Sequence, residues 1–446
     1  MIDASKQVVQ TLRDAGYEAL WAGGSVRDRL LGRSCKDIDI ATSATPDQVL
    51  AEFDHTHEIG KAFGVVQVIV GGFEFEIATF RRDLEYTDGR HPSGIEPSDA
   101  KEDAQRRDFT INGMFFDPVT EEVIDYVGGR ADIDAKQIRA IGDPVERFAE
   151  DHLRMLRAIR FAQTLDFSIE PETWAAIQTH AHLVKGVSAE RIENELSRIW
   201  LEAKQPGTAL RMLLDSGLLE YVLPEAMAMH GCEQPPQYHP EGDVFIHTEL
   251  MLNFMEERSL QLAWAILFHD MAKPDVATVT IEDDGSERIR FNGHDTVGAT
   301  KADEVMKRLK FSNADREAIK TAVANHMKYY RVKEMRKNTL RKLVGSPTFD
   351  LEMELHRIDC ASIGRATENW QFLKEFEASF AAEPVLPEPL VSGRDVMAIG
   401  VPPGREVGVW KMAAYDRQLE DKSETQAQLL AWIQSERAAQ VNPSGE

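Results

Sequence analysis

The stretch that decides the fold of this chain runs from residue 19 to residue 41, ALWAGGSVRDRLLGRSCKDIDIA. An apolar strand leads into Gly23 and Gly24, and the acidic pair Asp37 and Asp39 opens the next strand. Residues two apart on a strand point to the same side, so the two carboxylates share a face. Carboxylates so aligned can hold magnesium ions that bridge nucleotide phosphates and a hydroxyl nucleophile. The stretch therefore indicates phosphoryl or nucleotidyl transfer.

The length of 446 residues exceeds the roughly 250 to 300 residues over which one hydrophobic core usually keeps growing, so two to four domains are expected. No apolar run approaches the ~18 residues of a membrane span, and the N-terminal segment reads as amphipathic rather than as a signal sequence. Three scattered cysteines offer no disulfide framework,. We expect a soluble cytoplasmic protein that has no membrane partner.

The net charge of -24 argues against a protein that coats nucleic acid, so any RNA contact must be local,. Two basic clusters are candidates. Arg154, Arg157 and Arg160 share one expected helix, and the segment 328–342 carries seven Lys or Arg with Tyr329 and Tyr330,. A solvated helix face is the alternative interpretation of both clusters, and for the second it is equally good.

The pattern predicts four domains. Residues 1–145 alternate strands and helices and form an α/β head; residues 146–230 form a helical neck and body; residues 243–380 form a second helical block; residues 385–446 form a helical tail,. Within the head, residues 65–70 and 73–80 read as a hairpin across two glycines, and residues 83–101 read as a mobile loop.

Beyond the head, one continuous helix is expected over residues 146–163, a linker over 231–242, and a hairpin around 283–286 inside the second helical block,.

In the head, Gly24 lets backbone approach a triphosphate, and Arg27 can bind phosphate oxygens through its planar fork. In the later segment RRDFTIN, residues 106–112, Arg107 can take phosphate while Asp108 and Asn112 can hydrogen-bond ribose hydroxyls,. A tight turn with solvated acids, and a capped helix start, would explain these pieces separately. Their joint occurrence favours a nucleotide site.

Asp151 and Arg154 stand three apart on the expected helix and so share a face,. A carboxylate accepts from an exocyclic amine and an arginine donates to a ring nitrogen or carbonyl, so the pair complements cytosine and adenine. Guanine and uracil would set a carbonyl oxygen against the carboxylate, at a cost of roughly 1 to 3 kcal/mol. An ordinary intrahelical salt bridge is the alternative interpretation.

Taken in order, GGSVRD, DID, RRDFTIN, EDHLR and the later SAERIENEL resemble the class II tRNA nucleotidyltransferases, which include the CCA-adding enzymes, and the related bacterial poly(A) polymerases,. The resemblance spans roughly the first half of the chain. It implies a head of the DNA polymerase beta-like nucleotidyltransferase type followed by helical domains.

The resemblance also implies residue roles. Asp37 and Asp39 become catalytic Mg²⁺ ligands, Gly24 and Arg27 contact the triphosphate, and Arg107 joins the nucleotide site. Base selection and phosphate binding fall to Asp151, Arg154, Arg157 and Arg160. The stretch 82–92 looks like the flexible loop of family members that add the terminal A.

The second helical block carries the ordered residues His247, His269, Asp270, His294, His326 and Asp359. That order resembles an HD phosphohydrolase site, in which imidazole and carboxylate ligands hold a divalent transition metal. A lone histidine on an apolar helix is usually a core residue, but six such residues in this order favour a metal site. The ligand types do not say whether the site is active.

The sequence thus predicts template-independent addition of C, C and A to the 3′ end of tRNA from CTP and ATP with Mg²⁺, with a possible accessory phosphohydrolase activity. A poly(A) polymerase or an A-adding tRNA nucleotidyltransferase is the nearest alternative. A metal-dependent phosphohydrolase with a nucleotide-binding head is an alternative of another class, and an RNA-binding regulator is a third that the net charge disfavours.

Overall fold

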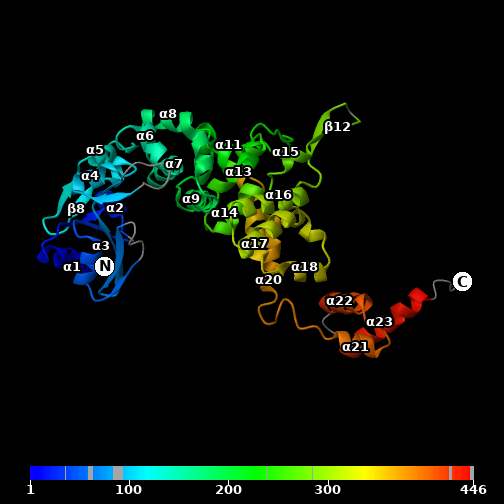
Figure 1. Cartoon of the computed structure of the whole chain (residues 1–446). Helices are drawn as coiled ribbons and strands as arrows, with labels where there is room; N and C mark the ends of the chain where they lie inside the picture. The colour runs from blue at the N-terminus through cyan, green and yellow to red at the C-terminus, as the bar shows by residue number, and fades with distance from the viewer. Residues whose placement is uncertain are drawn as a thin grey trace. The chain divides into compact units, whose positions relative to one another are not determined.

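The computed structural model describes residues 1–35, 37–58, 64–83, 94–237, 239–283, 285–420 and 424–441. The chain forms two compact units, residues 1–232 with 305–311, and residues 233–304 with 312–446. A sheet-based part occupies the N-terminal region, and helices make up most of the rest (Figure 1). Within the described residues, no helix is both long and apolar enough to cross a membrane.

The first unit opens with an α/β head built on one seven-stranded sheet. The strand order is β3-β4-β5-β2-β1-β8-β9, with β2 and β5 parallel and the other neighbouring pairs antiparallel. The strands are β1 (Ala19–Ala22), β2 (Asp39–Thr42), β3 (Thr56–His57), β4 (Val65–Val70), β5 (Phe73–Thr79), β8 (Phe115–Asp117) and β9 (Glu122–Ile124). The expected α/β head is confirmed, as is the hairpin of β4 and β5.

Helices α1 (Ile2–Asp14) and α3 (Pro46–Glu52) contact each other and pack against β4. α1 buries Val8, Val9 and Leu12 on one face, the spacing that makes a helix amphipathic. α3 begins with a capping box, in which the Thr45 and Gln48 side chains each bond the other residue's backbone N–H,. Helix α2 (Gly24–Leu30) follows the glycine turn and contacts β1 and the turn η2 (Thr110–Asn112).

The segment 83–101, expected as an irregular loop, is partly regular. Strands β6 (Arg81–Asp83) and β7 (Ile95–Pro97) pair as an antiparallel ribbon, and α4 (Ala100–Gln105) follows, with Asp99 as N-cap accepting from the Glu102 N–H. Pro97 is tolerated because a strand in a two-stranded ribbon has an unpaired edge. Residues 84–93, which include most of the stretch likened to the family's flexible loop, lie outside the described residues.

The rest of the first unit is helical apart from the short pair β10 (Gln137–Ile138) and β11 (Ser168–Ile169). Its elements are η2 (Thr110–Asn112), α5 (Gly129–Asp134), α6 (Pro144–Glu150), α7 (Arg154–Leu165), α8 (Pro171–His180), η3 (Ala181–Gly186), α9 (Ala189–Glu202), α10 (Pro206–Asp215), α11 (Leu219–Val222) and α12 (Pro224–Met227).

The single helix expected over residues 146–163 is wrong, because the chain breaks between α6 and α7. Asp151 has extended backbone (φ -146°, ψ 105°), and its carboxylate accepts the Leu153 N–H at 3.1 Å. An aspartate that bonds nearby backbone in this way competes with helix continuation. Asp151 therefore lies outside α7, the helix that begins at Arg154, and the two residues do not share one helix as expected.

The second unit is mostly helical, and its strands β12 and β13 pair as an antiparallel hairpin in which β12 is exposed and β13 is mostly half-buried. The hairpin expected around residues 283–286 is therefore confirmed, although residue 284 is outside the described part. The elements are α13 (Val244–Asn253), α14 (Leu260–Phe268), α15 (Lys273–Val276), β12 (Thr278–Ile281), β13 (Glu287–Arg290), α16 (His294–Arg308, whose end belongs to the first unit), α17 (Asn313–Asn325), η4 (His326–Glu334), α18 (Lys337–Val344), α19 (Phe349–Ser362), α20 (Glu368–Ala378), α21 (Gly393–Ala398), α22 (Arg405–Glu420) and α23 (Gln426–Val441).

Gly129 at the start of α5 packs directly against the turn η2. A Cβ atom added there would lie 2.2 Å from the Thr110 carbonyl oxygen and 2.8 Å from its carbon. We predict that Gly129→Ala lowers the free energy of unfolding by about 1 to 3 kcal/mol, because the turn must shift to make room. Urea denaturation measures this. As a control, Gly408→Ala in α22, where a Cβ meets nothing within 4 Å, should leave stability unchanged or raise it slightly; equal losses in both variants would contradict the prediction.

Candidate nucleotide cleft and histidine cluster

The glycine turn lies against Arg107 and Asp39. Gly23 has a φ of 69°, and a Cβ added there would lie 3.1 Å from Arg107 Nη1 and 3.9 Å from Asp39 Oδ2. The left-handed backbone favours glycine, and the missing side chain lets the turn approach both charged groups. The glycine is therefore needed for close approach as well as for conformation.

Asp37 and Asp39 both face solvent, while Ile38 between them is buried. The expected shared side is present, although β2 begins only at Asp39. Desolvation raises the pKa of Asp39, Glu76 and Asp37 raise it further by repulsion, and Arg107 opposes them. A carboxylate crowded by two other acids favours a bound cation, so the donor set fits a divalent ion.

Glu76 is a third acid near Asp39 that the sequence analysis missed. It stands on β5, which pairs with β2 so that Ile77 lies opposite Ile40. Alternation in FEFEI, residues 73–77, exposes Glu74 and Glu76 and buries Phe75 and Ile77. That alternation was a usable signal, but the sequence does not reveal that β5 neighbours β2.

A chain of polar contacts joins three separate segments across the head and α7. Arg27 Nη1 donates to Asn112 Oδ1 at 2.8 Å, Asn112 Nδ2 donates to Asp108 Oδ1 at 3.2 Å, and Arg157 Nε donates to Asp108 Oδ2 at 2.9 Å. Burial tends to raise the pKa of Asp108, but the charge and hydrogen bonds of Arg157 outweigh it, with help from Asn112, and lower the pKa to about 2. Asp108 therefore stays ionised between its partners.

Asp103, in α4, orients the two arginines that precede Asp108. Its Oδ1 accepts from Arg106 Nη2 at 2.8 Å and its Oδ2 from Arg107 Nη2 at 3.0 Å, while the side chain is 1% exposed. Burial tends to raise the pKa of Asp103, but Arg107 and Arg106 lower it overall. Arg107 is thereby held toward the glycine turn.

Arg154 and Arg160 in α7 are buried rather than solvated. Arg154 pairs with Glu150 and donates to the carbonyls of Arg147 and Arg106. Arg160 pairs with Glu195 at 2.5 Å. The alternative of an exposed basic helix face is therefore wrong for these two side chains.

Three arginine guanidinium groups lie near the ring of Phe161. The centroid distances are 5.3 Å for Arg27, 5.3 Å for Arg157 and 4.2 Å for Arg160. The ring's negative face attracts cations, which allows three like charges to approach one another.

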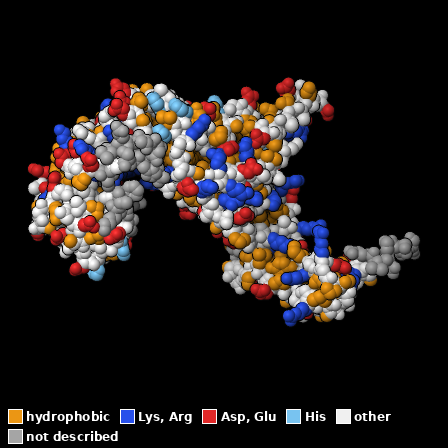
Figure 2. All heavy atoms as spheres, viewed as in Figure 1, with side chains coloured by type: hydrophobic (Ala, Val, Ile, Leu, Met, Phe, Trp, Pro, Cys, Tyr) orange, Lys and Arg blue, Asp and Glu red, His pale blue; other side chains and the backbone are white. Residues whose placement is uncertain are grey.

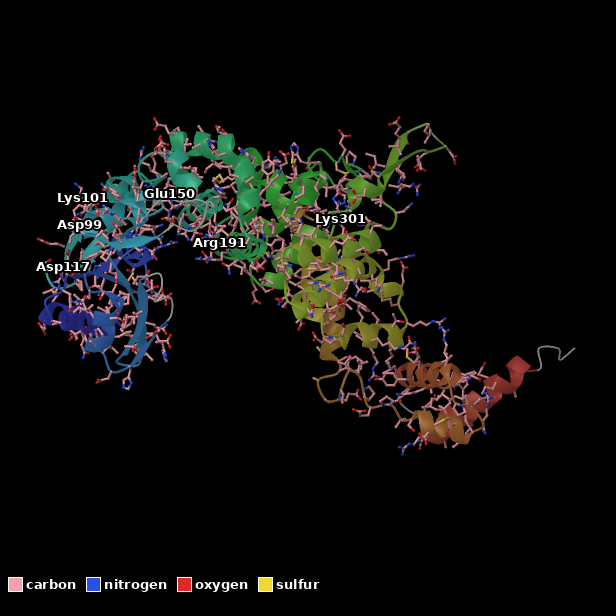
Figure 3. All side chains as sticks on the ribbon, in the orientation of Figure 1. Asp99, Lys101, Asp117, Glu150, Arg191 and Lys301 are labelled. Carbon is pink, nitrogen blue, oxygen red and sulfur yellow. The ribbon has the colours of Figure 1, made fainter. Side chains whose placement is uncertain are left out.

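Asp151 is paired with Arg191 of α9, at 2.7 Å between Asp151 Oδ2 and Arg191 Nη2. Figure 3 labels Arg191 on α9 and Glu150 at the end of α6. Because the other oxygen of Asp151, Oδ1, accepts the Leu153 N–H, the Asp151 carboxylate is fixed in orientation. Arg191 was quoted within a motif but was not predicted as a site residue.

One cavity of about 970 Å³ unites these groups. All eleven residues predicted for the metal and nucleotide roles line it: Gly24, Arg27, Asp37, Asp39, Arg107, Asp108, Asn112, Asp151, Arg154, Arg157 and Arg160. Arginines dominate the lining, whereas acidic side chains are spread over the face of the molecule in Figure 2. The cavity therefore concentrates positive charge in an acidic protein, which suits a polyanionic ligand.

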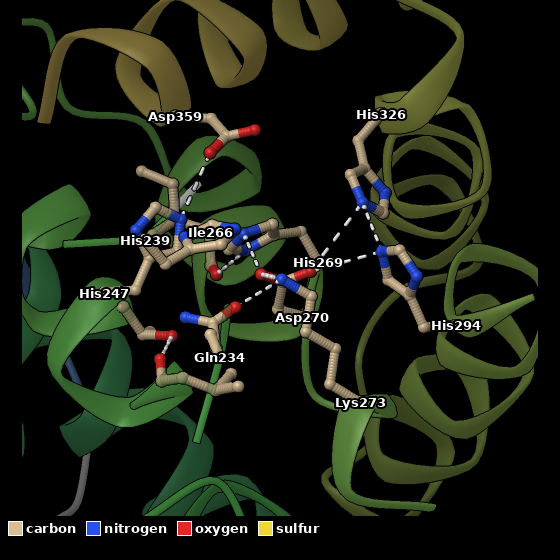
Figure 4. A network of polar contacts seen from close by, with 12 residues as sticks. Gln234, His239, His247, Ile266, His269, Asp270, Lys273, His294, His326 and Asp359 are labelled. Atoms are coloured by element: carbon tan, nitrogen blue, oxygen red, sulfur yellow. Dashed lines mark hydrogen bonds and ion pairs between the residues drawn. The ribbon is translucent and has the colours of Figure 1, made fainter. Parts of the chain in front are cut away.

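The second unit brings together all six predicted HD residues (Figure 4). Two groups each place one ligand atom per residue within 4.8 Å of one another, one made of His247, His269 and Asp359 and the other of Asp270, His294 and His326. Asp270 Oδ1 lies 3.3 Å from His294 Nε2, and its Oδ2 lies 3.2 Å from His269 Nε2. Asp270 therefore stands between the two groups.

Three of the histidines are oriented by the same local device. The Nδ1 atoms of His269, His294 and His326 lie 2.7, 2.7 and 2.6 Å from the backbone carbonyls of Ile266, Phe291 and Val323. A carbonyl accepts only from a protonated nitrogen, so Nε2 is left with the lone pair that can bind a metal. Burial, with the neighbouring His269, lowers the pKa of His326 to about 4 and keeps it in the neutral, ligating form,.

The segment 231–242, expected to be only a linker, supplies side chains to this cluster. Glu241 Oε1 lies 2.8 Å from His247 Nδ1 and 2.9 Å from His239 Nδ1, and Gln234 Oε1 accepts from Lys273 Nζ at 2.6 Å. These partners were missed because prolines and polar residues are typical of linkers. The histidine and glutamate within the segment were the signal that could have found them.

The cluster 328–342 is not a uniform basic surface. Tyr329 and Arg341 are buried, and the Tyr330 hydroxyl donates to Asp359 Oδ2 at 2.7 Å. Arg341 donates to the carbonyls of Val385 and Pro384. Part of the segment thus belongs to the core and part to the histidine cluster.

Three family models match the chain in succession. They are the poly A polymerase head domain over residues 19–139, the probable RNA and SrmB-binding site of polymerase A over residues 166–229, and the HD domain over residues 239–363. The chain belongs to the family of class II tRNA nucleotidyltransferases and poly(A) polymerases. Family membership accounts for the cleft and the histidine cluster occurring in one chain.

Relatives within this family are named CCA-adding enzymes. One from Levilactobacillus brevis is 45% identical over 222 residues, covering 49% of this chain and 55% of the relative. One from Lactococcus lactis subsp. lactis is 38% identical over 278 residues, covering 61% and 66%. The matched region thus spans between about half and two thirds of these relatives' length.

Solved structures of the family resemble the chain over nearly its whole length. The Bacillus stearothermophilus CCA-adding enzyme in complex with CTP has a TM-score of 0.76 at 25% identity and covers 99% of both chains. The Thermotoga maritima CCA-adding enzyme complexed with tRNA has a TM-score of 0.59 at 18% identity, covering 97% of this chain and 94% of that one, and shows the fold alone.

The ion pair of Asp108 and Arg157 should give a pH-dependent contribution to stability. We predict that Asp108→Asn lowers the free energy of unfolding at pH 7 by about 3 to 5 kcal/mol, because it leaves Arg157 without its partner. The folded pKa of Asp108, about 2, lies below the unfolded value, so the contribution is fully present above about pH 5 and is lost as the pH falls toward 2.

Urea denaturation of both proteins at several pH values from 7 to 3 tests this. The difference between wild type and variant should shrink below about pH 5. Asp134→Asn, at an exposed position in α5, controls for the loss of one surface charge. A difference that stayed constant down to pH 3 would contradict the assignment.

Proposed function

We propose that the protein adds C, C and A to the 3′ end of tRNA, without a nucleic acid template, from CTP and ATP. The observation that carries the proposal is the single cavity in which Asp37 and Asp39 meet the arginine-rich wall of α7. The CTP complex of the family member that matches the whole chain supports the choice of nucleotide.

The two aspartates fit Mg²⁺, which when bound would activate the terminal 3′-hydroxyl and neutralise the departing pyrophosphate. Arg27 and Arg107, beside the glycine turn, bind the triphosphate through their planar forks. Asp108 and Asn112 hold Arg157 and Arg27 in place and face the ribose. Each of these residues positions a group or compensates charge, which is what phosphoryl transfer requires of a protein.

Base choice falls to Asp151 and Arg154. Arg191 and the Leu153 N–H fix the carboxylate as an acceptor for an exocyclic amine. The contacts of Arg154 within the described residues occupy three of its five N–H groups,. The remaining donors can meet a ring nitrogen or carbonyl, so the pair complements cytosine and adenine and repels uracil and guanine.

The experiment supplies tRNA lacking its last three nucleotides with CTP or ATP separately. We expect CTP incorporation, which a poly(A) polymerase or an A-adding enzyme would not show. Replacing Asp37 and Asp39 together by Ala should lower incorporation by at least about a thousandfold, because the charge stabilisation of the transition state is removed. Asp14→Asn, on α1 outside the cavity, is the matched control. Full activity of the double variant would rule out the proposed metal site.

We infer a second activity, metal-dependent phosphoester hydrolysis, at the histidine cluster. With Nδ1 of His269 donating to the Ile266 carbonyl, the Nε2 lone pair faces Asp270 Oδ2 at 3.2 Å with no proton between them, and the six proposed ligands form two groups of three. Imidazole nitrogens and carboxylates in this arrangement fit two divalent transition metals, which when bound would supply an activated water. The protein's part is to orient the imidazoles through their Nδ1 contacts.

We predict that His294→Ala removes about one of two bound metal equivalents and lowers phosphoesterase activity by at least about a hundredfold, since a ligand loss should exceed the effect of losing an outer partner. Elemental analysis of the purified protein, together with hydrolysis of a p-nitrophenyl phosphoester, measures both. CTP incorporation should not change. His182→Ala, at an exposed position, is the control; unchanged metal content in His294→Ala would remove this residue from the site.

A further inference from the structure

A cavity of about 440 Å³ lies over the histidine cluster, within the size range of small-molecule sites. Asp270, His294, His326 and Asp359 line it, so the proposed metal ligands are part of its wall. Strand β13 contributes Arg288, Ile289 and Arg290 from the hairpin. The hairpin, which carries the label β12 in Figure 1, therefore belongs to this site.

Four cationic side chains line the cavity, namely Lys273, Arg288, Arg290 and Arg365. Lys273 is held by Asp270 at 2.5 Å and by Gln234. Arg290 is held by Glu282 at 2.9 Å across the hairpin. The Arg288 side chain forms no ion pair or hydrogen bond within the described residues, and is partly exposed.

The carboxylates of the cavity neutralise only part of this charge, that of Lys273. Asp359 is engaged by His247 at 3.1 Å and by the Tyr330 hydroxyl, and Asp270 by Lys273 and two histidines. Metal ions would add further positive charge beside them. The wall formed by the hairpin thus retains a positive charge opposite the metal ligands.

The remaining lining is apolar or aromatic. Ile289 lies in β13, and Phe291 directly follows the end of that strand. Met327 and Tyr330 line the cavity from η4. Apolar and aromatic side chains bind the ribose and base of a nucleoside, and cationic ones bind phosphate. The cavity therefore offers two anion-binding positions, the metal cluster and the hairpin, with an apolar surface as well.

We propose that the β12–β13 hairpin is a substrate-binding arm and that Arg288 binds a second phosphate of the substrate. The ligand is a nucleotide with a phosphomonoester at one end of its ribose and another phosphate at the other end. A nucleoside 3′,5′-bisphosphate and the last nucleotide of an RNA ending in a 3′-phosphate share this chemistry. The inference rests on the proposed phosphohydrolase function.

In the reaction, the oxygen of water forms a bond to the 3′-phosphorus and the bond from phosphorus to the 3′-oxygen breaks. One proton of the water passes to the 3′-oxygen, so the products are inorganic phosphate and a 3′-hydroxyl. The second phosphate is unchanged and serves only for binding at Arg288.

The test compares adenosine 3′-monophosphate with adenosine 3′,5′-bisphosphate as substrates of the full chain. We expect Arg288→Gln to raise KM for the bisphosphate by about tenfold, the loss of one charge-assisted contact, and to leave kcat and the KM for the monophosphate unchanged. Arg331→Gln removes the same charge from an exposed side chain outside the cavity and should change neither KM. Equal KM changes for the two substrates, or none, would overturn the role of Arg288.

Equilibrium binding separates this inference from the function on which it rests. Titration of adenosine 3′,5′-bisphosphate in EDTA into wild type and Arg288→Gln compares proteins whose nucleotide cleft is identical. Weaker binding to the variant supports the arm even if no phosphoester is hydrolysed, an outcome that would refute only the hydrolase. Unchanged binding refutes the arm. A short RNA with a 3′-phosphate, run beside the bisphosphate, assigns the ligand to RNA ends if its KM is lower and to free nucleotides if it is higher.

Discussion

The buried contact between Asp108 and Arg157 is the interaction on which the nucleotide cleft depends. An ionised carboxylate that is 8% exposed is stable only because Arg157 and Asn112 compensate its loss of water,. The same contacts extend to Arg27, behind the glycine turn. One compensated charge thus links the head to α7, and with them the aspartates proposed to bind metal to the residues proposed to select the base.

The histidine cluster is built on a different principle, in which three of its histidines are oriented by nearby backbone. His269, His294 and His326 each lie near the carbonyl three residues earlier, at a point where a helix ends or begins. Ile266 and Val323 lie in the last turns of α14 and α17, where carbonyls have no partner within the helix, and Phe291 lies between β13 and α16,. The backbone itself therefore selects the tautomer. Asp270, in the turn after α14, and Asp359, in α19, then complete the groups, and residues of the hairpin also line the cavity.

Much of the fold could be predicted because its signals are local. The apolar strand before Gly23, the hairpin of β4 and β5, and the helical spacing of α1 and α9 each follow from residues close together in the chain. Two predictions failed. The long helix failed because the Asp151 side chain bonds the Leu153 N–H and so competes with the helical backbone. The irregular loop failed because residues 95–97 pair as a strand, with Pro97 at its end.

The sequence by itself determined the kinds of groups present: glycines for a tight turn, paired aspartates for a metal, arginines for phosphate, and ordered histidines for a second site. Only the tertiary structure decided which of these groups meet. Arg27 and Asn112 are 85 residues apart, Asp108 and Arg157 are 49, and His247 and Asp359 are 112. The fold likewise brings Glu76 near Asp39, Arg191 to Asp151 and Glu241 to His247. The physical reason is that hydrogen bonds and charges act over a few ångströms, so their partners are fixed by how the core packs and not by spacing along the chain.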